Sequence, residues 1–262
     1  MNPIWPVRAV AAGLIAAVLA VVLAACAAPS PQRPEPTRAE TAAGFNLQLG
    51  IAYLRQNNLA LAKEKLERAL AQNPRDPNVH AAMALLHERF GDAAAADRAY
   101  RNAIRIDGRN PDIQNNYAVF LCRSGRVEDG VERFQAVARN PLYRTPDVAY
   151  TNAGVCLRSA RRLDEAASKL ARALTIRPNA AEAAFQLGDL DLERGKLDEA
   201  RTRLDQYLAA FTPTPDLLLL GTRIARAQGD RLAEERFGRR LTRDFPESEQ
   251  ARSWARQPRG ES

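Results

Sequence analysis

The sequence is poor in cysteine, histidine and aromatic residues, and each shortage argues against a class of protein. Its 262 residues include three Cys and two His, and aromatic side chains make up 6%. No two cysteines have the close spacing of a zinc site. The few aromatics, together with long stretches of Ala, Leu, Glu and Arg, argue against an all-β fold.

Long hydrophobic runs and clustered charges are also scarce. The mean hydropathy is −0.38 and there is a single long apolar run, which excludes a membrane protein with several spans. The 38 basic residues outnumber the 31 acidic ones, but no basic run is longer than the pairs Arg161-Arg162 and Arg239-Arg240. Because nucleic-acid binding needs basic residues gathered on one face, we expect no nucleic-acid partner.

Motifs that carry catalysis are missing as well. There is no Gly-rich phosphate loop and no Ser, His and Asp at the spacing of a catalytic triad. His80 and His87 lie seven residues apart, on one helical face beside Glu88, but no third metal ligand is in register. Both histidines occupy packing positions. We therefore expect a protein that is not an enzyme and has no metal, cofactor or small-molecule substrate.

The N-terminus has the features of a secretory signal. One basic residue, Arg8, precedes the apolar run 9–22, and the next residues are Leu-Ala-Ala followed by Cys26. This ending resembles a bacterial lipobox, which implies that residues 1–25 are a lipoprotein signal peptide and that Cys26 is lipid-modified. The alternatives are an uncleaved signal anchor or an ordinary signal peptide with an incidental Cys. Ala27, where Asp would imply retention in the inner membrane, implies a lipid anchor in the outer membrane, facing the periplasm.

Residues 26–42 form a proline-rich segment that predicts a tether without a core. Pro29, Pro31, Pro34 and Pro36 alternate with small and polar residues. In an extended form at ~3 Å per residue, such a segment would hold a folded domain several nanometres from its anchor.

The rest of the chain repeats with a period of 34 residues. The copies align on six small residues, which are Gly50, Ala84, Ala118, Gly154, Gly188 and Gly221. Twelve residues later another small residue follows, and four beyond it a bulky one. Small residues let two antiparallel helices approach closely, and the large ones fill the space to the next pair. Gly91, Gly125, Gly195 and Gly229 supply tight turns between the helices.

This pattern resembles the tetratricopeptide repeat (TPR), which implies an all-α, right-handed α-solenoid of about six helix pairs. The expected repeats cover residues 43–247, at about 43–76, 77–110, 111–146, 147–180, 181–213 and 214–247. Residues 248–262 are expected to form a short capping helix, with Trp254 docked on the last repeat, and a tail. The pattern leaves no apolar face obviously unused.

Two cysteines lie 34 residues apart, on the first helices of consecutive repeats. First helices of adjacent repeats pack side by side, so Cys122 and Cys156 are placed at nearly matching heights. In an oxidising periplasm this favours a disulfide, which would pin repeats 3 and 4 together. The alternative is two buried free thiols that act as small apolar fillers.

The inner face of the first helices is the candidate binding surface. Apolar residues gather in the first two copies, three Arg share one column, and Asn residues share another. The predicted partner-binding groove comprises Leu47, Ile51, Leu54, Arg55, Leu85, Arg89, Asn115, Asn116, Arg123 and Asn152. Such a groove suits an extended or helical peptide segment. The alternative is that the Arg side chains are only solvated, that the Asn side chains bridge neighbouring helices, and that the tether covers the apolar patch.

A narrower resemblance lies in repeats 3 and 4. Generic TPR packing does not explain residues 115–126 (NNYAVFLCRSGR), 140–143 (NPLY) and 149–157 (AYTNAGVCL). With the lipobox and the six repeats, these segments resemble the PilF/PilW family of type IV pilus lipoproteins. The resemblance implies a pilotin, which binds the pilus secretin and promotes its outer-membrane localisation and multimerisation; some members are instead described as stabilising assembled fibres.

The alternative function is a periplasmic TPR scaffold for another envelope machine. Examples are an adaptor for peptidoglycan hydrolases or a component of outer-membrane protein assembly. Those proteins also combine a lipobox with TPRs, but they are not expected to carry the central cysteine-containing segments.

Overall fold

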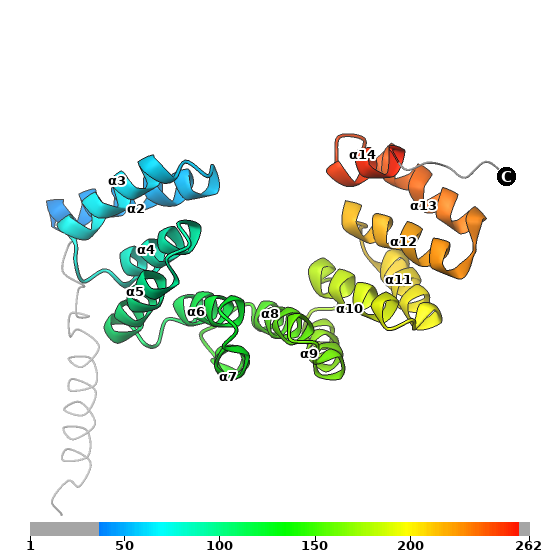
Figure 1. Ribbon diagram of the computed structural model, residues 1–262, viewed down its shortest axis with the longest axis horizontal. Helices are drawn as coiled ribbons and strands as arrows, with labels where there is room; N and C mark the ends of the chain where they lie inside the picture. Colours follow the sequence, from blue (N-terminus) through cyan, green and yellow to red (C-terminus); the bar gives the residue numbers. More distant parts are fainter. Residues whose placement is uncertain (1–36, 257–262) are drawn as a thin grey trace, which may run out of the picture. The chain divides into compact units, whose positions relative to one another are not determined.

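A computed structural model describes residues 37–256 of the chain, and within that range it contains thirteen α-helices and no strand (Figure 1). The predicted signal peptide, Cys26 and the part of the predicted tether up to residue 36 lie outside the described residues. The helices are α2 (Arg38–Arg55), α3 (Leu59–Gln72), α4 (Pro77–Arg89), α5 (Ala93–Ile106), α6 (Pro111–Arg123), α7 (Val127–Arg139), α8 (Pro146–Ser159), α9 (Leu163–Ile176), α10 (Ala181–Glu193), α11 (Leu197–Ala210), α12 (Pro215–Gln228), α13 (Arg231–Asp244) and α14 (Glu249–Ala255). None of these helices is long and apolar enough to cross a membrane.

The helices from α2 to α13 form six consecutive pairs, which confirms the all-α fold of six helix pairs. From α4 onward, each first helix of a pair contacts the second helix of the preceding pair. Neighbouring first helices from α4 to α12 also contact each other, whereas the second helices α5, α7, α9, α11 and α13 make no such contact with one another. The first helices therefore lie on the inner side of the stack, where the pairs are closest together.

The helix ends follow from local chemistry. Asp76 and Asn110 each accept a hydrogen bond from the first turn of the helix that follows, and a proline comes next, where no backbone N–H is needed. Asn58 caps α3 in the same way. Short polar residues at these positions satisfy N–H groups that would otherwise lack partners.

The helix α2 begins inside the segment predicted as tether, at Arg38 rather than after residue 42. The cause is a capping box, in which the Glu40 backbone N–H donates to Thr37 Oγ1 at 3.2 Å and the Thr37 N–H donates to the Glu40 carboxylate at 2.7 Å. The prolines in this segment favoured a tether, but the sequence Thr-x-x-Glu at residues 37–40 is a signal for a helix start.

Four of the six turns within the pairs use the expected glycines. Gly91, Gly125, Gly195 and Gly229 have φ between 71° and 78°, in the left-handed region that favours glycine. The same turn is made in the first and fourth pairs by Asn57 (φ 56°) and Arg161 (φ 63°). Asn tolerates this conformation, and Arg161 shows that the flanking helices impose it even on an unfavourable residue.

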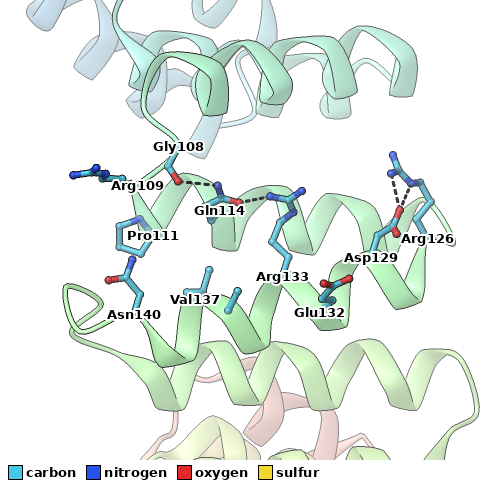
Figure 2. A pocket seen from close by; sticks show the side chains of 11 residues that line it. Gly108, Arg109, Pro111, Gln114, Arg126, Asp129, Glu132, Arg133, Val137 and Asn140 are labelled. Carbon is cyan, nitrogen blue, oxygen red and sulfur yellow. Dashed lines mark hydrogen bonds and ion pairs between the residues drawn. The ribbon is translucent and has the colours of Figure 1, made fainter.

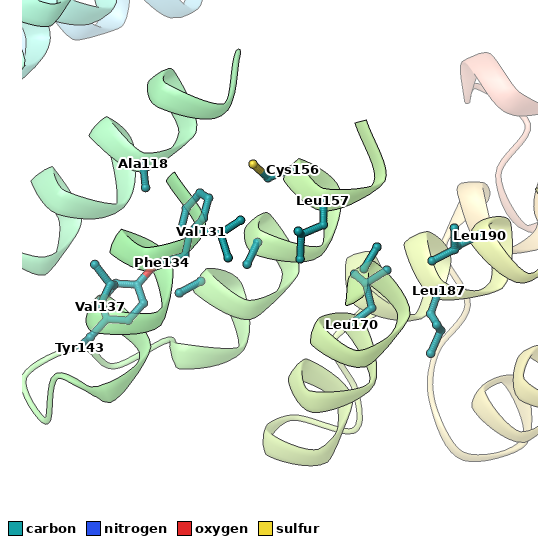
Figure 3. Close-up of a cluster of buried hydrophobic side chains, with 13 residues drawn as sticks. Ala118, Val131, Phe134, Val137, Tyr143, Cys156, Leu157, Leu170, Leu187 and Leu190 are labelled. Carbon is teal, nitrogen blue, oxygen red and sulfur yellow. The ribbon is translucent and has the colours of Figure 1, made fainter. Parts of the chain in front are cut away.

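The core consists of the small and bulky columns seen in the sequence. A Cβ added to Gly154 would lie 2.6 Å from Leu170 Cγ, so only glycine lets α8 and α9 approach this closely. Leu170 is fully buried, as are Phe134 and Leu157 of the same hydrophobic cluster (Figure 3). Burial of each such side chain contributes roughly 1.5–3 kcal/mol.

One residue of the bulky columns is charged. Asp191, in α10, stands where the other copies have a large side chain (Tyr53, His87, Leu121, Leu157 and Ile224), and it is 3% exposed. Arg203, in the next helix, donates from Nε to the Asp191 carboxylate at 3.0 Å. Burial nevertheless raises the pKa of Asp191, because the loss of hydration outweighs the nearby positive charges, Arg203 first among them.

A disulfide joins Cys122 in α6 to Cys156 in α8, with their Cα atoms 5.6 Å apart. It links the third and fourth pairs through their first helices. Gly130, in α7, packs against it, since a Cβ there would lie 2.4 Å from Cys122 Sγ. In a stack where each pair contacts only its neighbours, this bond ties the two halves together.

We predict a distinctive pH dependence for Asp191→Asn. Because the folded-state pKa of Asp191 is raised, its contribution to stability is greatest below the ordinary Asp pKa of about 3.9 and is lost as pH rises through the folded pKa. The variant does not titrate at this position. Its free energy of unfolding relative to wild type should therefore increase between pH 4 and pH 7, as measured by urea denaturation.

The control is Asp244→Asn, because a hydrogen bond from Arg243 lowers the pKa of Asp244. A lowered pKa stabilises the fold above the ordinary value, so the relative stability of this variant should fall or stay flat over the same pH range. Equal pH trends for the two variants would contradict the assignment of Asp191.

We also predict that loss of the disulfide weakens the fold. The bond closes a loop with a sequence separation of 34 residues, and Cys122→Ser with Cys156→Ser should lower the free energy of unfolding by about 4 kcal/mol in the loop-entropy model. Reductant should destabilise wild type by a similar amount and leave the double variant unchanged. Two reactive thiols from these positions in denatured, unreduced wild-type protein would show that the bond does not form.

Candidate functional site

The apolar end of the inner face is made by α2. Leu47 and Ile51 are half-buried and Leu54 is 6% exposed. They pack with the buried Leu66 and Leu86 of the next helices. The predicted apolar floor is thus part of the core of the first two pairs, with only its edges open to solvent.

The next part of the inner face is a hollow of ≈330 Å³ between the ends of α4 and α6. Leu85, 36% exposed, and the buried Phe120 give it an apolar lining. Arg89 and Arg123 bring guanidinium groups to the same hollow. The structure therefore brings together three residues of the predicted groove, one apolar and two basic.

The arginine column links neighbouring helices. Arg89 Nη1 donates to Asn57 Oδ1 at 3.3 Å, and Arg123 Nη1 lies 3.5 Å from Glu88 Oε2. The Arg123 side chain is still 71% exposed, and Arg55 is also exposed. A surface pair of this kind contributes little, about 0–1 kcal/mol, so Arg123 can turn to a carboxylate of a partner at small cost.

Glu88, which pairs with Arg123, is also bound by a buried residue of the core. The buried Tyr100 hydroxyl donates to Glu88 Oε1 at 2.8 Å. Burial, and then the charge of Glu88, raise the pKa of Tyr100, so the hydroxyl keeps its proton and remains a donor. Glu88 is fixed between a buried tyrosine and an exposed arginine.

The asparagine column behaves differently from the arginine column. Asn152 Nδ2 in α8 donates to Asn115 Oδ1 in α6 at 3.2 Å, and Asn115 is 9% exposed. This pair bridges neighbouring helices, as the alternative interpretation held. Asn116 is half-buried beside it. These amides position α6 against α8.

The second half of the inner face carries a charged network that the sequence reasoning missed. Arg158 in α8 donates to Asp189 and to Glu193 of α10, each at 2.8 Å. Arg223 in α12 donates to the other Asp189 oxygen at 2.5 Å. Arg161 also pairs with Glu193. These residues occupy different columns of the repeat, so reading one column at a time could not show that they meet.

A larger hollow, of ≈490 Å³, lies beside α6 and α7 (Figure 2). Its polar groups bond to one another: Gln114 Nε2 donates to the Gly108 carbonyl at 3.1 Å, Arg133 donates to Gln114, and Arg126 pairs with Asp129 at 2.6 Å. The lining carries both signs of charge, so it indicates no particular ligand.

The histidines do not form a metal site. His80 lies 2.9 Å from the Pro74 carbonyl through Nε2, and no group of three or more His, Cys, Asp or Glu side chains suited to a metal occurs within the part of the chain that the structure describes. Glu88, which the sequence suggested only as a companion of His87 in a metal site, instead lines the arginine hollow and pairs with Arg123.

Two family models described as tetratricopeptide repeat match the chain, one at residues 47–111 and 121–181 and the other at residues 157–224. Among curated proteins, the type IV pilus assembly protein PilF of Pseudomonas aeruginosa is 29% identical over 233 residues, which cover 88% of this chain and 92% of that protein.

Two solved structures agree with this relationship. The structure of P. aeruginosa PilF is 27% identical with a TM-score of 0.64, over 84% of this chain and 99% of that one. PilW, described as a widely conserved type IV pilus biogenesis factor, is 27% identical with a TM-score of 0.65, over 80% of this chain and 97% of that one. The chain therefore belongs to the tetratricopeptide-repeat proteins, a non-catalytic scaffold family, and is homologous to PilF and PilW.

Proposed function

We propose that this chain acts in type IV pilus biogenesis as a pilotin. It binds the pilus secretin in the periplasm and promotes the localisation and multimerisation of the secretin in the outer membrane. The observation that carries the proposal is the homology to PilF, which runs through the whole repeat region rather than through isolated repeats.

The inner face supports a peptide-binding role. The hollow between α4 and α6 offers the apolar Leu85 next to the exposed guanidinium of Arg123. This combination fits a secretin segment in which an apolar side chain is followed or preceded by Asp or Glu. The disulfide joins α6, which lines this hollow, to α8 of the next pair, and such a bond restricts the movement of the two helices relative to each other.

The proposed mechanism is physical. The lipid on Cys26 anchors the chain in the inner leaflet of the outer membrane, and the proline-rich tether gives the repeats reach. Several acyl chains on one cysteine hold the protein firmly, since each buried CH₂ contributes roughly 0.8 kcal/mol. Tethering raises the local concentration of secretin subunits where the ring assembles, without any change in their mutual affinity.

In cells that carry this protein, we predict that its deletion abolishes the heat- and detergent-resistant secretin multimer. In a Cys26→Ser strain the multimers should form but fractionate away from the outer membrane, because the protein binds the secretin without an anchor. The measurement is an immunoblot of secretin in unheated samples from separated membranes, with the protein's own abundance checked in each strain.

Unchanged and correctly localised multimers in both strains would contradict the proposal. A fibre-stabilising role would then predict fewer surface pili with normal secretin. A scaffold for another envelope machine, such as a peptidoglycan hydrolase adaptor, would predict normal pili and an altered cell wall.

A further inference from the structure

The outward side of α2 carries an exposed apolar stripe. Phe45 is 64% exposed and Leu49 is 46% exposed, and Ala52 follows on the same side of the helix. Their spacing of four and then three residues places them in one line along α2. Large apolar side chains this exposed are few among the described residues, and two of them lie in this stripe.

In the other repeats, the positions equivalent to this stripe are buried by a neighbouring helix. The positions equivalent to Phe45 in the next four copies are Val79, Ile113, Ala149 and Ala183, which are 0–2% exposed. The positions equivalent to Ala52 in those copies are Leu86, Phe120, Cys156 and Leu190, which are 0–4% exposed. In these copies the second helix of the preceding pair packs against the first helix. Among the described residues, the stripe on α2 is therefore a helix-docking face that no preceding pair covers.

Within residues 37–256, which the structure describes, no helix precedes α2. The sequence before α2 is the proline-rich segment, which predicts a tether rather than a helix because proline removes backbone donors. At the other end of the stack, α14 contacts α12 and α13 of the last pair (Figure 1). Trp254 of α14 is 8% exposed, and a Cβ on Gly238 would lie 2.1 Å from it. A second copy therefore cannot extend the stack head to tail.

We propose that this face pairs with the same face of a second copy, as a two-fold symmetric dimer in which α2 packs antiparallel to α2 of the partner. Such an isologous contact closes on itself and leaves the capped end free. The expectation from the sequence that no apolar face is left unused was wrong, because the sequence pattern does not distinguish the first repeat from the internal ones.

The stripe is complementary to itself in shape. In an antiparallel pair centred between Gln48 and Leu49, Phe45 faces the partner's Ala52, so the largest side chain meets the smallest at both ends. Leu49 lies beside the two-fold axis, next to the partner's Leu49. The charged residue nearest to the stripe, Arg55, faces the partner's Ala42, so no like charges oppose each other.

The dimer leaves the inner face open. Leu47, Ile51 and Leu54 are offset by two residues from the stripe, which is about 200° around the helix, so they point to the other side of α2. A contact between two α2 helices buries a small area, and we therefore expect a weak dimer in solution. If the chain is anchored in a membrane as proposed, the raised local concentration favours pairing; the pairing itself does not depend on a secretin partner.

The test is site-directed crosslinking of the full-length protein in membranes of the expressing cells, with a short bismaleimide. Leu49→Cys should give a covalent homodimer several-fold more efficiently than Leu232→Cys, which lies at the other end of the stack and is 84% exposed. Co-expressed, differently tagged Phe45→Cys and Ala52→Cys chains should crosslink to each other more than either does to itself.

Addition of Phe45→Asp to the Leu49→Cys chain should abolish the homodimer while the protein remains folded, as judged by helical circular dichroism. Equal dimer yields from positions 49 and 232 would overturn the proposal. A Leu49→Cys product with a different protein would overturn it too, and would assign the face to that partner. Neither result depends on secretin assembly, so the dimer and the proposed function fail separately.

Discussion

The close approach of two helices within each pair is the constraint on which the rest of this structure depends. A glycine or alanine on the first helix and another on the second remove the side chains that would hold the helices apart. Where glycine occupies the position, as at Gly50 or Gly154, an added Cβ would lie 2.6 Å from the leucine of the facing helix. The bulky residue of the second helix then packs against the small residue of the first. The short distance between the two helices also requires a tight turn to connect them. Each pair thereby exposes one apolar face, which only another pair or a cap can cover.

This constraint also separates the two sides of the molecule. From α4 to α12, neighbouring first helices contact one another and second helices do not, so side chains of successive first helices meet on the inner side. There the copies differ: an apolar edge and the arginine hollow in the first three, and an Arg–Asp–Glu network in the last three. The disulfide between α6 and α8 lies at the boundary between these halves. The bond holds the copies that carry the arginine hollow against the copies that carry the Arg–Asp–Glu network. The charges of that network already pair with one another.

Most of the fold was predictable because the repeat period encodes it directly. The helix pairs, the turn glycines and the column of small residues were all visible in the sequence. The site was less predictable, because its residues come from columns that only the stacking brings together. Leu85, Arg89 and Arg123 were identified from their columns, whereas Glu88 and the Arg158 network were not. Asn116 and Asn152 were assigned to one column with Asn115 beside it, but the hydrogen bond between α8 and α6 joins Asn152 to Asn115. The beginning of α2 was misplaced because the capping box of Thr37 and Glu40 was overlooked beside the prolines.

The central claim is that the hollow between α4 and α6 holds a segment of the pilus secretin. The most direct measurement compares secretin binding by Leu85→Asp with binding by Leu232→Asp. Both variants place a carboxylate at an exposed leucine, one beside the arginine hollow and one on α13. Affinity measured by isothermal titration with purified secretin periplasmic domains should fall at least tenfold, or about 1.4 kcal/mol, for Leu85→Asp alone. Equal affinities for the two folded variants and wild type would contradict the account.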